Sequence, residues 1–395
     1  MEKLINITGK ALSGEWGIDD KEGIGIPVLR TTNFTNDGIV DYSNVITRTI
    51  AKKNIADKFL RKGDIIIEKS GGSDNQPVGR VVYFDNDENK YLFNNFTGLL
   101  RVKDTTKWLP KYIFYSLFAN YQSGGTRRYE NKTTGLHNLQ TDFYVKDFEI
   151  KEISYSEQIE ICELFDKITY LIDKRKQQLE KLDELVKSRF IEMFGNGNYP
   201  MVKAESVCEF ITKGTTPPTG EIYAEFDDNK VPYLKVYNLS FDGSLLFDSE
   251  PQYINKEIHN GKLSRSKVYP NDVLMNIVGP PLGKFSLVTA EYPEWNINQA
   301  ISIFRAKKDV LPRFLLSALM QPTVLKPFLK QAVGVRQLNI SLEQCRNLQF
   351  PLPPIERQNE FVNFAEQTDK SKLEVQKSLE KLELLKKALM QKYFG

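Results

Sequence analysis

The sequence contains one 40-residue segment twice: SEQIEICELFDKITYLIDKRKQQLEKLDELVKSRFIEMFG at 156–195 and ERQNEFVNFAEQTDKSKLEVQKSLEKLELLKKALMQKYFG at 356–395. The two copies align without a gap at an offset of 200, and ten of the 40 positions are identical, including Gln158 with Gln358 and LEKL at 179–182 with LEKL at 379–382. Self-similarity of this kind indicates an internal duplication, and the architecture must therefore be interpreted as a tandem repeat.

Each copy is predicted to form a long amphipathic helix, because apolar residues recur at spacings of three and four, as in a coiled-coil seam. In the first copy the seam runs through Ile161, Phe165, Ile168, Ile172, Leu179, Leu182, Val186 and Met193, with Arg175 and Arg189 as exceptions. In the second copy it runs through Phe361, Ala365, Val375, Leu379, Leu382 and Leu389, with Lys372 and Lys386 as defects. Helices of this length are rarely stable alone, so we expect the two to pair with each other; packing of each on its own domain is the alternative.

Cap signals set the expected ends of these helices. Ser156, followed by Glu157 and Gln158, predicts an N-terminal cap, and Gly195 and Gly395 predict positive-φ stops.

The segments before the helices repeat less regularly. PVLRTTNFTNDG at 27–38 matches PYLKVYNLSFDG at 232–243, and KGDIIIEKS around Asp64 matches PNDVLMNIV around Asp272. Short apolar runs bounded by Gly, Asn and Asp predict strands, with helices at Pro110–Asn120 and Pro312–Gln321. The sequence thus predicts an α+β fold with a pseudo-twofold tandem repeat: mixed domains at 1–150 and 196–350, and antiparallel coiled-coil helices at 151–195 and 351–395.

Composition restricts the class of protein. The chain has 395 residues, of which 41% are hydrophobic. Its 54 Lys and Arg residues nearly balance its 51 Asp and Glu residues, so the net charge is small and any nucleic-acid surface must be local. Cys162, Cys208 and Cys345 lie far apart and predict neither a disulfide framework nor a zinc site. The chain has no run of 18 apolar residues and its start has no signal-peptide pattern, so we expect a cytoplasmic protein without membrane contact.

The usual catalytic arrangements are missing from the sequence. Its only histidines, His137 and His259, have no metal-ligand or nucleophile-base spacing. GPPLGK at 279–284 is one residue too short for a phosphate loop, and Phe285 replaces the hydroxyl residue that would bind magnesium. We therefore expect no catalytic residue, no metal and no cofactor. Carboxylate-x-Lys pairs at Glu88 and Glu149 suit a nuclease, but chance explains them in a chain with 27% charged residues.

Three stretches carry a resemblance to a known family. They are FPLPPIERQNEF at 350–361 before the helix ending KKALMQKYFG, ISYSEQIEICELF at 153–165 before the helix ending LVKSRFIEMFG, and GTTPP at 214–218 after VCEFITK. With these motifs the whole chain resembles the DNA-specificity subunit of type I restriction-modification enzymes. The first domain departs from the pattern, since it has SGEWG at 13–17 in place of a GTTP-like turn, and we expect its first strand to be built differently.

The resemblance implies two target-recognition domains that each read one half of a bipartite duplex DNA sequence, with the two helices setting the spacer. It implies a non-catalytic scaffold for two modification subunits, which carry methyl transfer; whether restriction subunits also join stays open. A 39-residue helix is about 58 Å long, which exceeds the roughly 34 to 36 Å between half-sites one DNA turn apart. Two other interpretations remain: a nuclease with its own DNA-specificity domains, and a coiled-coil adaptor that binds only proteins.

Base edges are read mainly by Arg, Lys, Asn and Gln side chains. The predicted DNA-binding residues of the first domain are Arg30, Asn33, Lys69, Ser70, Gln76, Arg127, Arg128 and His137. Those of the second are Lys235, Asn238, Asn276, Lys284, Gln299, Arg336 and Gln337. The alternatives are that Asn33 and Asn238 only cap Asp-Gly turns and that Arg127 and Arg128 lie in a solvated loop.

Overall fold

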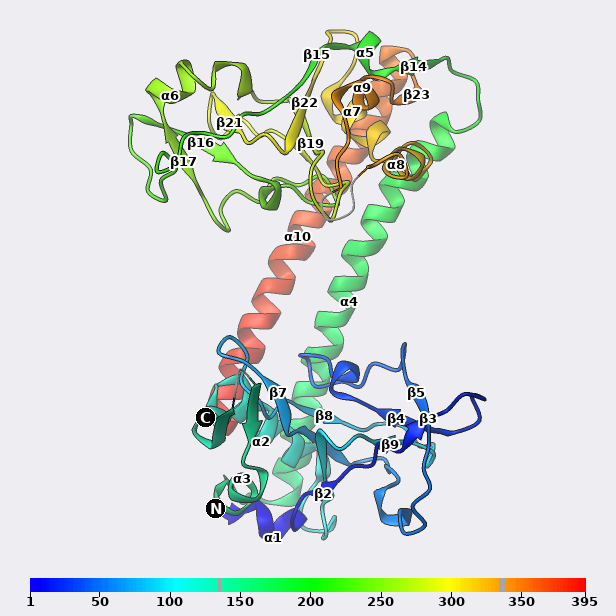
Figure 1. Cartoon of the computed structure of the whole chain (residues 1–395), viewed down its shortest axis with the longest axis vertical. Helices are drawn as coiled ribbons and strands as arrows, with labels where there is room; N and C mark the ends of the chain where they lie inside the picture. The colour runs from blue at the N-terminus through cyan, green and yellow to red at the C-terminus, as the bar shows by residue number, and fades with distance from the viewer. Residues whose placement is uncertain (134–135, 334–337) are drawn as a thin grey trace. The chain divides into compact units, whose positions relative to one another are not determined.

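The computed structural model describes residues 1–133, 136–333 and 338–395, and the chain divides into two compact units. Unit 1 consists of Met1–Lys174 together with Ser378–Gly395, and unit 2 is the continuous segment Arg175–Lys377. Two long helices, α4 (Tyr155–Phe194) and α10 (Ile355–Phe394), each contribute one part to each unit (Figure 1). No helix in the described part of the chain combines the length and hydrophobicity needed to cross a membrane.

Unit 1 is a mixed domain of short strands and helices. Its strands are β1 (Glu2–Lys3), β2 (Leu12–Ser13), β3 (Ile18–Asp19), β4 (Ile26–Leu29), β5 (Ile46–Thr49), β6 (Ile65–Glu68), β7 (Ser70–Gly72), β8 (Val81–Tyr83), β9 (Leu92–Phe93), β10 (Thr97–Leu100), β11 (Glu130–Thr133), β12 (Leu136–Leu139) and β13 (Glu149–Ile150). Its shorter helices are α1 (Leu4–Thr8), α2 (Pro110–Gln122) and α3 (Thr141–Asp147), with 3-10 turns η1 (Thr31–Asn33), η2 (Ala56–Lys58) and η3 (Gly125–Tyr129). The helix predicted from Pro110 is confirmed as α2.

The core of unit 1 lies on both faces of one sheet, which has the antiparallel order β2-β10-β6-β8. Ile65 and Ile67 of β6 pack in the cluster that includes Tyr112 of α2, whereas Ile66 packs on the opposite face with Phe93. Because both faces of β6 are covered, its residues form an uninterrupted apolar run instead of alternating between apolar and polar. The other sheets of the unit have the orders β3-β5-β4-β9, β11-β12-β7 and β1-β13.

Unit 2 repeats this plan. Its strands are β14 (Met201–Lys203), β15 (Cys208–Lys213), β16 (Lys230–Leu234), β17 (Tyr253–Asn255), β18 (Lys267–Val268), β19 (Val273–Asn276), β20 (Phe285–Leu287), β21 (Trp295–Ile297), β22 (Ile301–Ala306) and β23 (Gln349–Pro351). Its shorter helices are α5 (Ala204–Val207), α6 (Lys256–Asn260), α7 (Pro312–Leu319), α8 (Pro322–Leu329) and α9 (Leu342–Arg346), with turns η4 (Val236–Asn238) and η5 (Ser264–Ser266). Its sheets have the orders β15-β22-β19-β20, β17-β16-β21-β18 and β14-β23.

The same ion pair anchors the central strand of each unit. In unit 1, Oδ2 of Asp64 lies 2.7 Å from Nη2 of Arg101, and in unit 2, Oδ2 of Asp272 lies 2.6 Å from Nη2 of Arg305. Each aspartate also accepts a hydrogen bond from the backbone nitrogen three residues before it. The duplicated motif around Asp64 and Asp272 therefore marks one structural position in the two units.

A glycine in a tight place directly follows β2 in unit 1 and β15 in unit 2. A Cβ on Gly14 would lie 2.1 Å from the carbonyl oxygen of Asn94, and a Cβ on Gly214 would lie 2.1 Å from that of Asn298. The SGEWG and GTTPP motifs thus place glycine at the same close backbone approach. The two units share this glycine, but the strands before it differ as expected: β2 has two residues, whereas β15 has six and a register shift between Cys208 and Phe210.

The caps of α4 differ from those expected. Ser154, not Ser156, precedes the helix: its hydroxyl accepts from the backbone nitrogen of Glu157 (3.2 Å), and its backbone nitrogen donates to Oε2 of Glu157 (2.9 Å). This is a capping box, which places Ser156 inside the first turn. At the other end, the left-handed glycine is Gly197, with φ 76°, rather than Gly195.

The long helices pair in antiparallel fashion inside each unit. In unit 1 the ring of Phe165 from α4 lies 5.7 Å from that of Phe394 at the end of α10. In unit 2 Phe190, near the end of α4, lies 5.4 Å from Phe361 near the start of α10. The predicted α+β tandem repeat with two long antiparallel helices is therefore confirmed.

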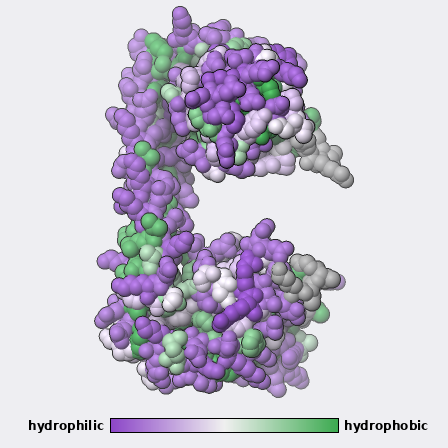
Figure 2. Space-filling model, turned by 90° about the vertical axis from the view of Figure 1, so that its left-hand side faces the viewer, coloured by the Kyte–Doolittle hydropathy of each residue, from purple (hydrophilic) through white to green (hydrophobic). Residues whose placement is uncertain are grey.

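Hydrophobic side chains also show among hydrophilic ones on the visible face of the helical segments (Figure 2).

Candidate nucleic-acid interface

The structure brings six predicted residues of unit 1 together around the sheet β11-β12-β7: Lys69, Ser70, Gln76, Arg127, Arg128 and His137. Ser70 is paired with Asn138 of β12, and the backbone nitrogen of Leu139 donates to the carbonyl of Lys69 (2.8 Å). Gly72 lets the strands approach, because a Cβ there would lie 2.7 Å from the backbone nitrogen of Val78. We call residues 69–76 with Arg127 and Arg128 the unit-1 loop surface.

Two arginines flank the loop of this surface. Arg127 donates from Nη2 to the carbonyl of Asp74 (3.0 Å), which ties the loop to η3. Arg128 is exposed, with its guanidinium 4.6 Å from the ring centre of Tyr129 and 3.5 Å from a carboxylate oxygen of Asp147. An arginine held against a ring keeps its outer N–H groups oriented for a phosphate or a base edge.

Lys69 and Gln76 complete the polar lining. Nζ of Lys69 donates to Oγ of Ser13 (2.9 Å), and burial lowers the pKa of Lys69, with the charge of Lys58 adding to the effect. Gln76 is exposed and makes a long hydrogen bond of 3.4 Å to the hydroxyl of Tyr121. Its amide is therefore weakly held and is available to a ligand.

His137 is placed with this surface but is buried. Its Nδ1 lies 2.8 Å from Oε2 of Glu130, and its Nε2 lies 3.5 Å from Oδ1 of Asp74. The other oxygen of Glu130 accepts from the backbone nitrogen of Val78 (3.0 Å). His137 thus holds the loop in place. Sequence reasoning missed its two partners, Glu130 in β11, which pairs with the strand of His137, and Asp74 in the loop after β7.

Asn33 and Asn238 have the same structural position in the two units. Oδ1 of Asn33 accepts from the backbone nitrogen of Arg30 (2.9 Å), and Oδ1 of Asn238 accepts from that of Lys235 (2.8 Å). Their amide groups donate to backbone carbonyls, including that of Asp41 (3.0 Å) in unit 1. Both side chains are buried, which supports the turn-capping alternative rather than base contacts. Arg30 is tied to the same turn through the carbonyl of Asn44 (2.9 Å).

Unit 2 has its own loop surface, formed by Lys235, Lys284 and Gln299 with the loop at 277–283. Backbone hydrogen bonds bring these parts together, from Asn298 to the carbonyl of Leu234 (3.1 Å) and from Ile277 to that of Ala300 (2.8 Å). Lys284 lies over the exposed ring of Phe241 at 5.7 Å, an aromatic residue that sequence reasoning missed.

Asn276 has a supporting role in this loop. Its fully buried amide accepts from the backbone nitrogen of Lys284 (2.8 Å) and donates to the carbonyl of Pro281 (2.9 Å), so it closes the loop across its ends. Arg336 and Gln337 lie outside the described residues.

The residues of the enzymatic alternatives do not assemble into a site. Glu88 forms an exposed ion pair with Lys90 (2.8 Å), and Glu149 lies in β13 opposite Lys3. Among residues 1–133, 136–333 and 338–395, no group of three or more His, Cys, Asp or Glu is placed to hold a metal ion. The three cysteines are free and buried, and burial raises the pKa of each thiol to about 12.

Comparison with known proteins gives a match for each half of the chain. The family model described as the type I restriction modification DNA specificity domain matches residues 3–184 and again residues 196–384. The type I restriction enzyme EcoBI specificity subunit of Escherichia coli is 30% identical over 148 residues, which are 36% of this chain and 30% of that protein. The putative type I restriction enzyme MjaX specificity subunit of Methanocaldococcus jannaschii is 21% identical over 405 residues, covering 99% of this chain and 91% of that protein.

Solved structures show the same fold at low sequence identity. A chain from a type I R-M system, solved in work on its complex assembly and conformational transition, has a TM-score of 0.58 and 16% identity, covering 99% of this chain and 96% of its own. The type I restriction-modification S subunit of M. genitalium has a TM-score of 0.53 and 16% identity, covering 100% of this chain and 95% of its own. The chain therefore belongs to the family of type I restriction-modification DNA specificity subunits, with one specificity domain in each half.

Proposed function

We propose that this chain reads a bipartite duplex DNA target, with unit 1 binding one half-site and unit 2 the other, while α4 and α10 fix the spacer. The observation that carries this proposal is the double match to one DNA specificity domain, at residues 3–184 and 196–384. A tandem repeat imitates a symmetric dimer but leaves each half free to diverge. Two related readers on one chain therefore favour a split target with unlike halves.

The contrast between scaffold and loops supports unlike half-sites. The scaffold pairs Asp64–Arg101 and Asp272–Arg305 are alike in the two units. The loop surfaces differ, since unit 1 presents Arg127 and Arg128 beside a β-hairpin, whereas unit 2 presents Lys284 over an aromatic ring. Because base-edge recognition depends on side-chain donors and acceptors, different loops on a common scaffold read different bases.

The long helices are suited to set a spacer. Each has 40 residues, and at about 1.5 Å per residue this gives roughly 60 Å of continuous helix. Half-sites one DNA turn apart are separated by roughly 34 to 36 Å. The helices are thus long enough for two readers to contact one duplex at a fixed separation.

We also propose that the chain is non-catalytic and works with two modification subunits, which carry methyl transfer, and with restriction subunits where cleavage occurs. Large apolar side chains on the long helices support a protein partner there: Tyr170 is 59% exposed, Leu185 47% and Leu384 69%. On α10, Leu384 has an exposed apolar neighbour in Leu385 (47%), and adjoining exposed apolar residues favour an interaction surface.

The decisive experiment maps methylated motifs in cells that express the chain with its modification subunits. We expect a split motif with a spacer of fixed length, and the purified chain alone should transfer no methyl group from S-adenosylmethionine. A duplex with one base pair added to the spacer, which moves one half-site by about 3.4 Å and rotates it, should bind much more weakly. A continuous motif, or methyl transfer by the chain alone, would overturn the proposal.

A second experiment tests the unit-1 loop surface. The double variant Arg127→Ala/Arg128→Ala should lower the affinity of the assembled complex for its target. It should also reduce the slope of log affinity against log salt by about one for each phosphate that the complex no longer binds. The variant Lys90→Ala removes an exposed cation outside this surface and is the matched control. Equal behaviour of the two variants would remove this surface from the proposed interface.

A further inference from the structure

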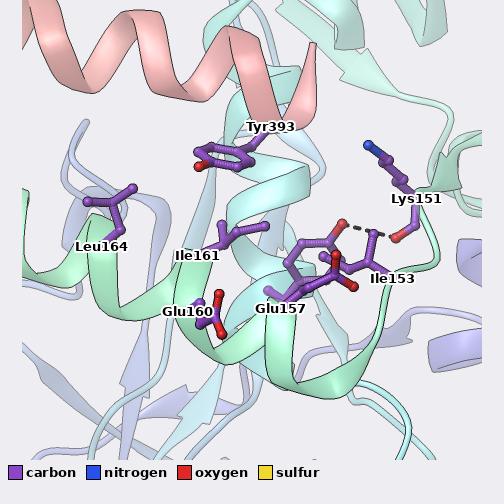
Figure 3. A pocket seen from close by; sticks show the side chains of 8 residues that line it. Lys151, Ile153, Glu157, Glu160, Ile161, Leu164 and Tyr393 are labelled. Carbon is purple, nitrogen blue, oxygen red and sulfur yellow. Dashed lines mark hydrogen bonds between the residues drawn. The ribbon is translucent and has the colours of Figure 1, made fainter.

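Unit 1 has a cavity of about 410 Å³ beside the start of α4, away from the unit-1 loop surface. Tyr393 from α10 faces Ile161 of α4 across it, with Glu157 and Glu160 from α4 and Lys151 from the preceding segment at its edge (Figure 3). The cavity has an apolar floor and a charged rim, so it can receive an apolar side chain whose neighbours are polar.

The corresponding place in unit 2 is covered by the chain itself. At the offset of 200, Glu157 corresponds to Arg357 and Ile161 to Phe361. There the segment 196–200, which leads from α4 to β14, places the ring of Tyr199 at 5.7 Å from that of Phe194, and the guanidinium of Arg357 hydrogen-bonds the Tyr199 hydroxyl. Tyr199 is half-buried against the core of unit 2. One aromatic residue of a short peptide thus fills this position.

The two-stranded sheet beside the cavity has the same backbone pairing as its counterpart in unit 2. Lys3 pairs with Glu149 in unit 1, as Lys203 pairs with Gln349 in unit 2, so the two-stranded sheets share their register. In unit 2 the next bond along this edge is donated by the nitrogen of Leu352 to the carbonyl of Pro200 (3.0 Å). Its counterpart in unit 1, the nitrogen of Glu152, has no acceptor in the described part of the chain.

The charge of the rim differs between the units and indicates what the occupant carries. The Arg357–Glu360 ion pair of unit 2 is replaced in unit 1 by two carboxylates, Glu157 and Glu160. Hydrogen bonds from Ser154 lower the pKa of Glu157, so this carboxylate is ionised at neutral pH. Lys151 is the cation of this rim, so two glutamates and one lysine leave it net negative; such a rim attracts a cation and accepts a hydrogen bond from a phenol.

We propose that this cavity is a docking site for an extended peptide segment of a partner protein, in which a tyrosine is followed by proline and preceded by a basic residue. The tyrosine ring packs between Ile161 and Tyr393, the carbonyl of the proline accepts from the nitrogen of Glu152, and the basic side chain lies beside Glu157 and Glu160. The inference does not rest on the DNA-reading proposal, because no residue of the unit-1 loop surface lines the cavity.

The test uses the full chain and synthetic peptides labelled with a fluorophore. The probe Asn-Gly-Lys-Tyr-Pro-Met copies residues 196–201 of this chain with a lysine in place of Asn198. Binding is measured by fluorescence anisotropy, and a photoreactive benzoylphenylalanine in place of the tyrosine locates the peptide by cross-linking. We expect cross-links within residues 151–164 or at Tyr393, and replacement of the peptide tyrosine by alanine should weaken binding at least about 10-fold.

Protein variants separate the two parts of the recognition. Glu160→Lys should weaken binding of the lysine-containing peptide by about 3-fold and less at high salt, as for an exposed ion pair. Glu163→Lys, which changes an exposed glutamate of α4 outside the cavity lining, is the matched control and should leave affinity unchanged. Ile161→Ala, with circular dichroism to verify its fold, should weaken both lysine-containing and lysine-free peptides. Cross-links outside the cavity, or equal affinity for the tyrosine and alanine peptides, would overturn the proposal.

Discussion

Gln158 and Gln358, which are 200 residues apart, make the same three hydrogen bonds in the two units. Oε1 of Gln158 accepts from the backbone nitrogen of Leu109 (2.8 Å), and Oε1 of Gln358 accepts from that of Leu311 (2.9 Å). Each Nε2 donates to two backbone carbonyls, one five residues before the glutamine and one just before α2 or α7. Both side chains are buried, so a single residue type joins the start of a long helix to the start of a domain helix.

Replacement of Gln358 by leucine should lower the free energy of unfolding of unit 2 by about 2 to 4 kcal/mol. The reason is that three backbone groups are left without a partner in a buried place, and each costs about 1 to 3 kcal/mol with partial relaxation. Chemical denaturation monitored by circular dichroism measures this change. Gln367→Leu, at an exposed position of the same helix, should change stability by less than about 0.5 kcal/mol. Similar decreases for both variants would contradict the assigned role.

His259 makes the stability of unit 2 depend on pH. It is fully buried, Nε2 lies 2.9 Å from Oε2 of Glu294, and Nδ1 accepts from the amide of Asn296 (3.0 Å). Burial lowers the pKa of His259 below its usual 6.5, and the charge of Lys267 lowers it further. The hydrogen bond and charge of Glu294 act in the opposite direction but do not cancel this decrease. Protonation of His259 would add a hydrogen to Nδ1, which would then point at the N–H of the Asn296 amide. Two donors cannot form a hydrogen bond with each other, so the neutral form of His259 is favoured.

The sign follows from linkage. Because the folded pKa is lower than the unfolded one, unfolded chains bind more protons, and stability is complete above about pH 6.5 and falls as the pH decreases below it. Thermal melts between pH 8 and pH 5 should show this loss. His259→Gln should be less stable at pH 8 and should have a flatter profile between pH 7 and pH 5. An unchanged slope in this variant would assign the pH dependence to other groups.

Lys372 stabilises unit 2 as a partly buried cation between two aspartates. Its Nζ lies 2.5 Å from Oδ1 of Asp183 and 3.0 Å from Oδ2 of Asp242. Burial alone would raise the pKa of Asp242, but hydrogen bonds from Ser240 and the charge of Lys372 lower it to about 2. The stabilisation is therefore complete above about pH 4 and is lost as the pH falls toward 2.

Lys372→Met should lower the free energy of unfolding at pH 7 by about 1 to 2 kcal/mol, a modest value because both aspartates are about one-third exposed. The difference from the unmodified chain should become smaller at pH 3, because Asp242 binds a proton in the unfolded chain there while its lowered pKa keeps it ionised in the folded one. Lys377→Met, which removes an exposed cation of the same helix, is the control. A difference that grows on acidification would contradict this ion network.

The contact of Phe165 with Phe394 should dominate the pairing of the long helices in unit 1. Phe165 is fully buried, and its ring also lies 5.1 Å from that of Tyr115. Phe165→Ala should lower the stability of unit 1 by about 3 to 5 kcal/mol, because it removes buried apolar surface and leaves a cavity behind. Tyr170→Ala, at a 59% exposed position of the same helix, should have a small effect. Calorimetry of both variants provides the measurement.

The duplication, the helices and the fold class could be predicted because they depend on local periodicity and on repetition. Less could be predicted where a residue depends on a distant partner. Arg189 and Lys372 are defects of the apolar seam, yet Arg189 lies over the ring of Phe364 at 5.7 Å, and Lys372 meets two aspartates. No spacing rule shows such partners, since they come from other parts of the fold. The family membership followed from motifs that are specific in order as well as composition.

The candidate site was predicted only in part for the same reason. Asn33 and Asn276 are the residue type that reads adenine, but their amides are used by nearby backbone groups. Residue type alone does not distinguish a buried asparagine that closes a turn from an exposed one that meets DNA. Gln76 and Arg128 remain candidates for the proposed interface because their side chains are exposed. Their exposure, rather than their residue type, distinguishes them from the buried asparagines.

Unit 1 is assembled from two separate segments of the polypeptide, because Tyr393 and Phe394 pack on Tyr112, Tyr115 and Phe165. A ribosome delivers residues 1–174 first but their packing partners in residues 378–395 only after it has made unit 2, so the unit that is begun first is completed after the other. Nascent chains will carry an uncovered aromatic face throughout translation of unit 2, and a premature stop codon anywhere after α4 would leave that face exposed to chaperones and proteases.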